Sequence, residues 1–234
     1  MDVGKKQIKN IAIFCGSRFG ATPEYKQQAE EVCSLLAADN RNLVYGGGHS
    51  GLMGVAFDAF RDAGRGVTAV ITHIFRNVSG TVEHDKYTEK VVRSLSSRKQ
   101  KMIDAADAFV VLPGGFGTMD ELFTALAIID MQMAGRSKEF VKPVIVLNTN
   151  GIYDHLGELI KAQIRADFVH DGRQRLIRFC STPQEVVSKI RAWNHEGIKT
   201  AAQLVDEIQI AKAANGNNQA QTLKDMTGPT PPAP

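Results

Sequence analysis

The 234-residue chain has few of the features that mark secreted, membrane-bound or disulfide-stabilised proteins. Its three cysteines, Cys15, Cys33 and Cys180, lie far apart and form no Cys-x-x-Cys motif. Cys15 and Cys180 fall in apolar, strand-like runs, where the ordinary role of a cysteine is that of a small buried hydrophobe. No apolar run approaches the roughly 20 residues that span a bilayer, and the N-terminal segment lacks the apolar core of a signal peptide. We therefore expect a cytoplasmic protein without a membrane partner.

The chain also carries little net charge. Its formal net charge is +3, and basic and acidic residues are mixed along the sequence. Proteins that bind nucleic acids usually concentrate positive charge on one face or in one segment. We therefore expect no nucleic-acid partner.

Motifs of several catalytic classes are missing. The six histidines show no His-x-x-x-His spacing and have no cysteine companions, which gives a metal site little support. There is no Gly-x-Ser-x-Gly motif, and no Walker lysine follows any of the glycine-rich stretches. Catalysis, if there is any, has to use a carboxylic acid, an arginine and backbone dipoles.

What the sequence does contain is an alternation of strand and helix patterns. Short apolar runs typical of strands occupy residues 8–15, 42–45, 66–72, 86–92, 109–112, 143–149 and 177–181. Helical patterns follow most of them, at residues 22–36, 52–63, 94–106, 119–133, 152–164 and 182–193. This alternation predicts an α/β fold with a parallel sheet covered on both faces. We expect one domain over residues 1–196, then one more helix (199–214) and a disordered, proline-rich tail within residues 197–234.

The most informative stretch covers residues 108–123. A buried strand ends there in Pro113-Gly-Gly-Phe-Gly-Thr118, and apolar residues then recur at helical spacing. A glycine-rich turn before a helix points backbone N–H groups outward at the positive end of the helix dipole, which favours a phosphate. Thr118 stands at the expected N-cap, with Glu121 three residues later. These two residues either form a capping box that only closes the helix, or belong to a functional site.

Two more glycine turns follow strands, after residues 15 and 45. Because ligands of parallel sheets bind outside the carboxyl ends of the strands, we expect these turns to converge with the turn after residue 112. Gly46-Gly-Gly-His-Ser-Gly51 also matches the dinucleotide pattern Gly-x-Gly-x-x-Gly. The next strand, however, ends in Val70-Ile-Thr-His-Ile without the acidic residue that holds the ribose. A nicotinamide cofactor is therefore disfavoured, and a smaller ligand is expected.

Two cations interrupt the apolar face of the helix at residues 94–106. Leu95 and Met102 belong to that face, and Arg98 and Lys99 fall between them at helical spacing. Cations on an inward face are costly unless an anion or a wet cavity meets them. Either the two side chains snorkel at the edge of the face, or they meet a negatively charged ligand near the Gly-Gly-Phe-Gly-Thr turn.

Pro113-Gly-Gly-Phe-Gly-Thr-Met-Asp-Glu121, preceded by Arg98-Lys99, resembles the paired signature of the Lonely guy family. Members of this family are cytokinin-activating nucleoside 5′-monophosphate phosphoribohydrolases, often mislabelled lysine decarboxylases. The resemblance covers residues 8–193. It includes Phe14-Cys-Gly-Ser17, Leu43-Val-Tyr-Gly-Gly-Gly48, Gly51-Leu-Met-Gly54 and Gly151-Ile-Tyr-Asp154.

The resemblance implies a Rossmann-like, doubly wound α/β sheet in a single domain. It implies hydrolysis of the N-glycosidic bond of AMP-like nucleotides, which yields the free base and ribose 5-phosphate without a metal or organic cofactor. It also implies a homodimer in which the partner subunit helps to build the site.

Carried over by position, Arg98 and Glu121 match the catalytic pair of the family. The positions expected to bind substrate are Lys99, Gly114, Gly115, Gly117, Thr118, Gly47, Gly48 and Ser17. A carboxylate beside the ribose stabilises oxocarbenium character at C1′ and can orient the attacking water. Arg98 either binds the phosphate or holds Glu121 ionised and aligned.

The chain departs from the family around the base. Leu95-Ser96-Ser97 stand where family members commonly carry Met-His, and Ile128-Ile129-Asp130 stand where a tryptophan is usual. The loop after residue 71 lacks the usual Ile-Pro, and Glu83 is only a loose candidate for its substrate-contacting glutamate. Residues 135–141 look like an insertion. The base preference therefore does not carry over, whereas the phosphate site and the reaction type do.

Two other functions compete with this one. A non-catalytic nucleotide or molybdenum-cofactor carrier on the same fold would share the glycine turns, but the retained Arg98 and Glu121 argue against it. A ligand that copurifies intact and is never hydrolysed would favour the carrier. A lysine decarboxylase is rejected, because no lysine is placed to hold pyridoxal phosphate.

Overall fold

A computed structural model describes residues 7–76, 85–135, 140–170 and 172–195, together with Gln203 and Asp206. The chain divides into two compact units, Met1–Asp130 with Lys142–Ile198, and Met131–Val141 with Lys199–Pro234. Gln203 and Asp206 are helical, and the rest of the expected helix at residues 199–214 and the tail lie outside the described residues. Among the described residues, no helix is both long enough and apolar enough to cross a membrane.

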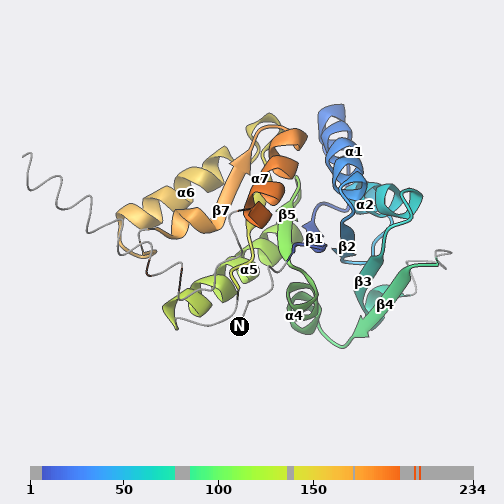
Figure 1. Cartoon of the computed structure of the whole chain (residues 1–234), viewed down its shortest axis with the longest axis horizontal. Coiled ribbons are helices and arrows are strands. Elements are labelled where there is room, and N and C mark those ends of the chain that lie inside the picture. The colour runs from blue at the N-terminus through green and yellow to red at the C-terminus, as the bar shows by residue number, and fades with distance from the viewer. Residues whose placement is uncertain are drawn as a thin grey trace, which may run out of the picture. The chain divides into compact units, whose positions relative to one another are not determined.

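Strands and helices alternate along the first unit (Figure 1). In chain order the strands are β1 (Asn10–Phe14), β2 (Asn42–Tyr45), β3 (Val67–Thr72), β4 (Tyr87–Val92), β5 (Ala108–Val111), β6 (Val144–Leu147) and β7 (Ile177–Cys180). The α-helices are α1 (Pro23–Ala38), α2 (Gly51–Asp62), α3 (His73–Arg76), α4 (Leu95–Ala105), α5 (Phe116–Ala134), α6 (Asp154–Arg165) and α7 (Pro183–His195). Two short 3₁₀ turns, η1 (Thr149–Gly151) and η2 (Arg173–Leu176), precede α6 and β7.

The strands form one seven-stranded sheet in the order β4-β3-β2-β1-β5-β6-β7, and every pairing is parallel. The chain moves outward from β1 to β4 on one side, then returns to place β5 against the other side of β1. Phe14 at the end of β1 is in register with Val111 at the end of β5. The strand order therefore reverses between β1 and β5, and a doubly wound sheet binds its ligands at this switch point.

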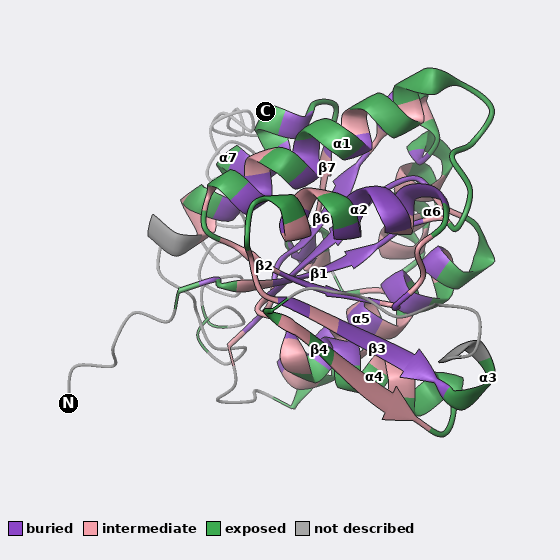
Figure 2. Ribbon diagram, turned by 90° about the vertical axis from the view of Figure 1, so that its right-hand side faces the viewer, coloured by how far each residue is buried: buried purple, intermediate pink, exposed green. Residues whose placement is uncertain are grey.

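Helices cover both faces of the sheet (Figure 2). Apolar side chains of α1, α2 and α7 pack with Ile13, Tyr45 and Leu112 from alternate strand positions in one core cluster. Figure 2 shows α4 and α5 on the opposite face. The four residues of β5 are all buried, as are the four of β6, because both of their faces are covered. All three cysteines are buried and unpaired, which confirms the role expected for Cys15 and Cys180.

The start of α5 differs from the expectation. α5 begins at Phe116, and the Met119 amide donates to the Gly115 carbonyl at 3.1 Å, so Thr118 lies inside the first turn and is not the N-cap. The capping-box interpretation of Thr118 and Glu121 was therefore wrong. A capping box does occur at α4, where the side chains of Ser94 and Ser97 each accept a hydrogen bond from the other's backbone amide. The short helix α3 also occupies part of the segment that was expected to be irregular.

Candidate active site

A cavity of about 760 Å³ opens at the carboxyl ends of β1, β2 and β5. Seven of the predicted site residues line it: Ser17, Gly48, Arg98, Gly115, Gly117, Thr118 and Glu121. This confirms that the three glycine turns converge at one place. A volume of this size is typical of small-molecule sites.

Backbone hydrogen bonds join the three turns. The Gly16 amide donates to the Pro113 carbonyl at 3.0 Å, and the Gly16 carbonyl accepts from the Leu52 amide at 3.0 Å. Gly51 has a φ of +58°, and a Cβ there would lie 2.3 Å from the backbone of Ser17. A glycine is required at residue 51 both by its left-handed conformation and by this close approach.

The turn between β5 and α5 presents backbone to the cavity. The first amides of a helix have no intrahelical acceptor, and here they belong to Phe116, Gly117 and Thr118. A Cβ at Gly115 or Gly117 would meet nothing within 4 Å, so the backbone there is uncovered. Gly114 differs, because a Cβ would lie 2.0 Å from Thr118 Oγ1. The turn therefore combines a packed base with an open rim suited to an anion.

Arg98 is held by three acceptors from three parts of the chain. Its Nε donates to the Val70 carbonyl at 3.0 Å, and its Nη2 donates to the Gly46 carbonyl at 3.2 Å. Its Nη1 lies 3.4 Å from Glu121 Oε1 in an ion pair. The arginine side chain is 18% exposed and that of Glu121 is 10% exposed, so the pair is largely removed from water. The guanidinium therefore does not snorkel at the edge of the helix face. It lines the cavity and faces Glu121, which is the arrangement expected if Arg98 holds that carboxylate aligned.

Burial dominates the ionisation of Glu121. Desolvation raises its pKa to about 7, although the Arg98 charge acts in the opposite direction. The neighbouring Asp120 raises the pKa further, and Lys99 lowers it. Glu121 therefore changes charge near neutral pH, in the range where a catalytic carboxyl group can gain or lose a proton.

Three predicted site residues do not line the cavity. The Lys99 ammonium pairs with Asp120 at 2.6 Å. Gly47, with a φ of +80°, lies against the Ile71 side chain, and Gly114 lies under Thr118. Glu83 lies outside the described residues.

Leu95 lines the cavity, in agreement with its expected place around the base. Sequence reasoning missed other lining residues, among them Cys15, His49, Met53, Ile71 and Phe116. The His49 ring packs edge-on against Phe57 at 4.7 Å, and its Nε2 is buried without a hydrogen-bond partner among the described residues. Burial lowers the pKa of His49. Its position within Gly46-Gly-Gly-His-Ser-Gly51 was the available signal.

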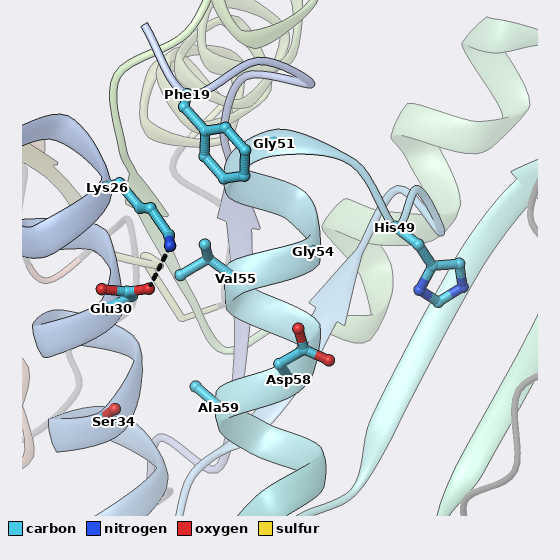
Figure 3. Close-up of a pocket in the computed structure, with 10 residues that line it drawn as sticks. All are labelled: Phe19, Lys26, Glu30, Ser34, His49, Gly51, Gly54, Val55, Asp58 and Ala59. Carbon is cyan, nitrogen blue, oxygen red and sulfur yellow. Dashed lines mark ion pairs between the residues drawn. The ribbon is translucent and has the colours of Figure 1, made fainter. Parts of the chain in front are cut away.

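A second hollow, of about 450 Å³, lies between α1 and α2 (Figure 3). Lys26 and Glu30, which face each other in Figure 3, form an ion pair at 3.3 Å, and Asp58 pairs with Arg61 at 2.7 Å. None of the predicted site residues, all of which are described, lines this hollow. The predicted site residues that line a cavity therefore all line the larger of these two.

Fold and site together define a Rossmann-like protein with an open anion-binding turn and a buried arginine–glutamate pair at its topological switch point. The family model described as "Possible lysine decarboxylase" matches residues 53–190. Cytokinin riboside 5′-monophosphate phosphoribohydrolase LOG7 of Arabidopsis thaliana is 33% identical over 223 residues, which cover 94% of this chain and 99% of that protein. The enzyme LOG of Oryza sativa subsp. japonica, with the same activity in its name, is 34% identical over 81% of this chain and 75% of its own length. The chain belongs to this family of phosphoribohydrolases, which are N-glycosidases.

Solved structures support the fold. The molybdenum cofactor carrier protein of Chlamydomonas reinhardtii superposes with a TM-score of 0.55 at 19% identity, over 80% of this chain and 99% of that one. The molybdenum cofactor binding protein of Rippkaea orientalis gives a TM-score of 0.54 at 19% identity, over 80% of this chain and 97% of that one. At this identity the likeness concerns the fold alone. It confirms the Rossmann-like, doubly wound α/β class.

Proposed function

We propose that the protein hydrolyses the N-glycosidic bond of AMP-like nucleoside 5′-monophosphates. The observation that carries this proposal is the Arg98–Glu121 pair, which lies in one cavity with the open turn at Gly115 and Gly117. An open glycine turn and a buried carboxylate in the same cavity suit a substrate with a phosphate at one end and a reacting sugar carbon next to it.

The phosphate is proposed to dock on the first turn of α5. Phe116, Gly117 and Thr118 supply its free amides, and the dipole of this long helix adds positive potential. Ser17 lines the same cavity from the turn after β1 and can donate its hydroxyl. Lys99, which pairs with Asp120 near the start of α5, contributes positive charge close to this end of the helix.

Glu121 is proposed to act as the ionised carboxylate. As the C1′–N bond breaks, positive charge develops on the ribose, and a carboxylate fixed beside it stabilises that charge. Water then supplies hydroxide to C1′ and a proton to the departing base, which gives ribose 5-phosphate and the free base. Arg98 is fixed by the Val70 carbonyl of β3 and by the Gly46 carbonyl of the turn after β2. Its proposed role is therefore to hold Glu121 in place and favour its charged form.

The base is proposed to occupy the side of the cavity lined by Met53, Ile71 and Leu95. These side chains are apolar, and the names of the relatives refer to cytokinin ribosides. An adenine that carries an apolar substituent would bind more tightly, because its substituent is buried against this surface. We therefore include such nucleotides among the proposed substrates.

The alternative is a non-catalytic nucleotide or cofactor carrier. The solved carrier proteins share the fold. A carrier does not need a buried carboxylate whose pKa lies near neutrality, so the raised pKa of Glu121 favours the hydrolase.

A homodimer is also part of the proposal. Phe116 is 96% exposed and Leu95 is 56% exposed, and both line the cavity. Exposed apolar groups beside a site are typical of a surface that a partner covers. Sedimentation of the purified protein at twice the mass of one chain is the expected result, and the mass of a single chain would refute this part.

The reaction is tested by incubating the protein with a panel of nucleoside 5′-monophosphates, N6-substituted AMP included, in buffer treated to remove metals. Chromatography should show the free base and ribose 5-phosphate appearing in equal amounts. A preparation of Glu121→Ala serves as the blank for contaminating nucleosidases. A bound nucleotide that stays intact through purification and incubation would instead support the carrier.

A further inference from the structure

Tyr153 reaches back to the end of β5 from the far side of the switch point. It follows β6 and η1, yet its hydroxyl donates to the Leu112 carbonyl at 2.8 Å. The tyrosine is 4% exposed, and burial raises its pKa well above the ordinary range for the residue. This hydroxyl is thus a permanent hydrogen-bond donor inside the protein.

Hydrogen bonds fix the backbone of the tyrosine. Its backbone amide donates to Asn148 Oδ1 at 2.7 Å, and Asn148 Nδ2 donates to Asp154 Oδ1 at 2.7 Å. The Asn148 amide donates to the Cys180 carbonyl at 2.8 Å, which ties the loop to β7. The position of the hydroxyl is therefore set by β6 and β7, elements that do not line the cavity.

Leu112 is the first residue after β5 and leads into the glycine turn. The Leu112 amide donates to the Phe14 carbonyl at 2.9 Å, and the next carbonyl, that of Pro113, accepts from Gly16 at 3.0 Å. Pro113 has no amide of its own to add a further bond. The Tyr153 hydroxyl is thus a third attachment at the point where the chain leaves β5 for Gly114.

From this geometry we infer that Tyr153 is a positioning residue for the phosphate turn. It touches no substrate, and it sets the direction in which the chain enters residues 114–118. The inference rests on the proposed function, because the turn that Tyr153 positions is the one proposed to bind the 5′-phosphate. The loss of one hydrogen bond at such a point should weaken phosphate binding and leave the chemistry at C1′ unchanged.

Tyr153→Phe tests this inference, because it removes the hydroxyl and keeps the ring. For a nucleoside 5′-monophosphate we expect KM to rise about five- to tenfold while kcat stays within about twofold. The inhibition constant of ribose 5-phosphate, which carries the phosphate without a base, should rise by the same factor. A purely structural tyrosine would lower the active fraction and hence kcat, with KM and the inhibition constant unchanged. That result, or no change in any of these constants, overturns the inference.

Tyr45→Phe is the matched control. Tyr45 is also buried, but its hydroxyl makes no hydrogen bond to the turn between β5 and α5. We expect wild-type KM for this variant, and an equal rise in both variants would reject a specific role for Tyr153. If Tyr153→Phe does not fold, Asn148→Ala is used instead, because it removes the side chain that accepts from the Tyr153 amide. This variant should also raise KM, by a smaller factor. An unchanged KM in that variant overturns the inference.

Different results would refute the proposed function and the inference on Tyr153. A wild-type protein that neither releases base nor binds ribose 5-phosphate refutes the proposed function, and the inference with it. An active wild-type protein whose Tyr153→Phe variant keeps the wild-type KM and inhibition constant refutes the inference alone.

Discussion

The guanidinium of Arg98 occupies the space that a side chain at residue 46 would need. A Cβ at Gly46 would lie 1.7 Å from Arg98 Nη2 and 2.9 Å from its Cζ. Gly46 also supplies one of the carbonyls that fix the guanidinium. The glycine is thus required by the arginine and not by a turn conformation.

We expect Gly46→Ala to displace Arg98 from Glu121. The variant should lose about 100-fold or more in kcat, since a shift of about 1 Å in a catalytic pair has effects of that size. It should also lose about 1 to 3 kcal/mol in the free energy of unfolding through overpacking. Steady-state kinetics and urea unfolding measure the two effects. Gly157→Ala is the control, because a methyl group there would make only an ordinary contact, 3.9 Å from the Phe179 ring. Wild-type turnover in Gly46→Ala would contradict the role given to Arg98.

At the scale of elements, α4 and α5 are joined by two adjacent ion pairs. Arg98 pairs with Glu121 at 3.4 Å inside the cavity, and Lys99 pairs with Asp120 at 2.6 Å behind it. The four residues form two consecutive pairs, one buried and the other partly exposed. Because Asp120 both raises the pKa of Glu121 and holds Lys99, this outer pair keeps Glu121 less acidic than Arg98 alone would make it.

Asp120→Asn should therefore shift the pH dependence of activity. The pKa of Glu121 is raised to about 7, so kcat/KM should fall as the pH drops below about 7 and the carboxylate takes up a proton. Removing the Asp120 charge and releasing Lys99 both favour the ionised form. The apparent pKa on the acidic side of the kcat/KM profile should consequently fall by about half a pH unit. The shift is modest because Asp120 is 56% exposed. Asp104→Asn on α4, whose carboxylate accepts from Gln100, is the charge-matched control. An apparent pKa that stays the same or rises in Asp120→Asn would contradict the proposed effect of Asp120 on Glu121.

The sequence predicted most elements but not all their ends. The strands at residues 42–45 and 109–112 agree with β2 and β5 to within a residue, because runs buried on both faces are bounded by glycines or proline. The start of α5 was misplaced because Phe116 and Gly117 are poor helix formers at the surface. Neither has an apolar contact that sequence periodicity would reveal, since Phe116 is 96% exposed. The Thr118 side chain lies directly against Gly114 within the same turn.

At the scale of the whole molecule, the strand order decides what meets in the cavity. The sequence indicated a parallel sheet, but only the placement of β5 beside β1 brings Pro113 against Gly16. Arg98 was predictable because a cation on an apolar helix face breaks the local pattern. Glu121 fitted an ordinary capping box, and only the family resemblance indicated it as a site residue. Met53 and Ile71 could not be predicted as site residues, because their side chains fit ordinary packing patterns and only the assembled sheet turns them toward the site.

The central claim is that Glu121 is the catalytic carboxylate, and Glu121→Gln tests it without disturbing the fold. The unperturbed pKa of a glutamate is about 4.3 and that of buried Glu121 is about 7, so the folded protein binds more protons than the unfolded chain between these values. Stability therefore falls as the pH rises through this window, and a neutral glutamine avoids that loss. The variant should be about 1 to 3 kcal/mol more stable than the wild type at pH 8, and this advantage should shrink to about 1 kcal/mol or less at pH 5.

The most direct measurement is kcat for release of base from a nucleoside 5′-monophosphate by Glu121→Gln at pH 8. We expect a loss of about 1,000-fold or more, while the affinity for ribose 5-phosphate stays within a few-fold of the wild type, because the phosphate turn is intact. A folded Glu121→Gln protein that releases base at a rate within about threefold of the wild type would contradict the account.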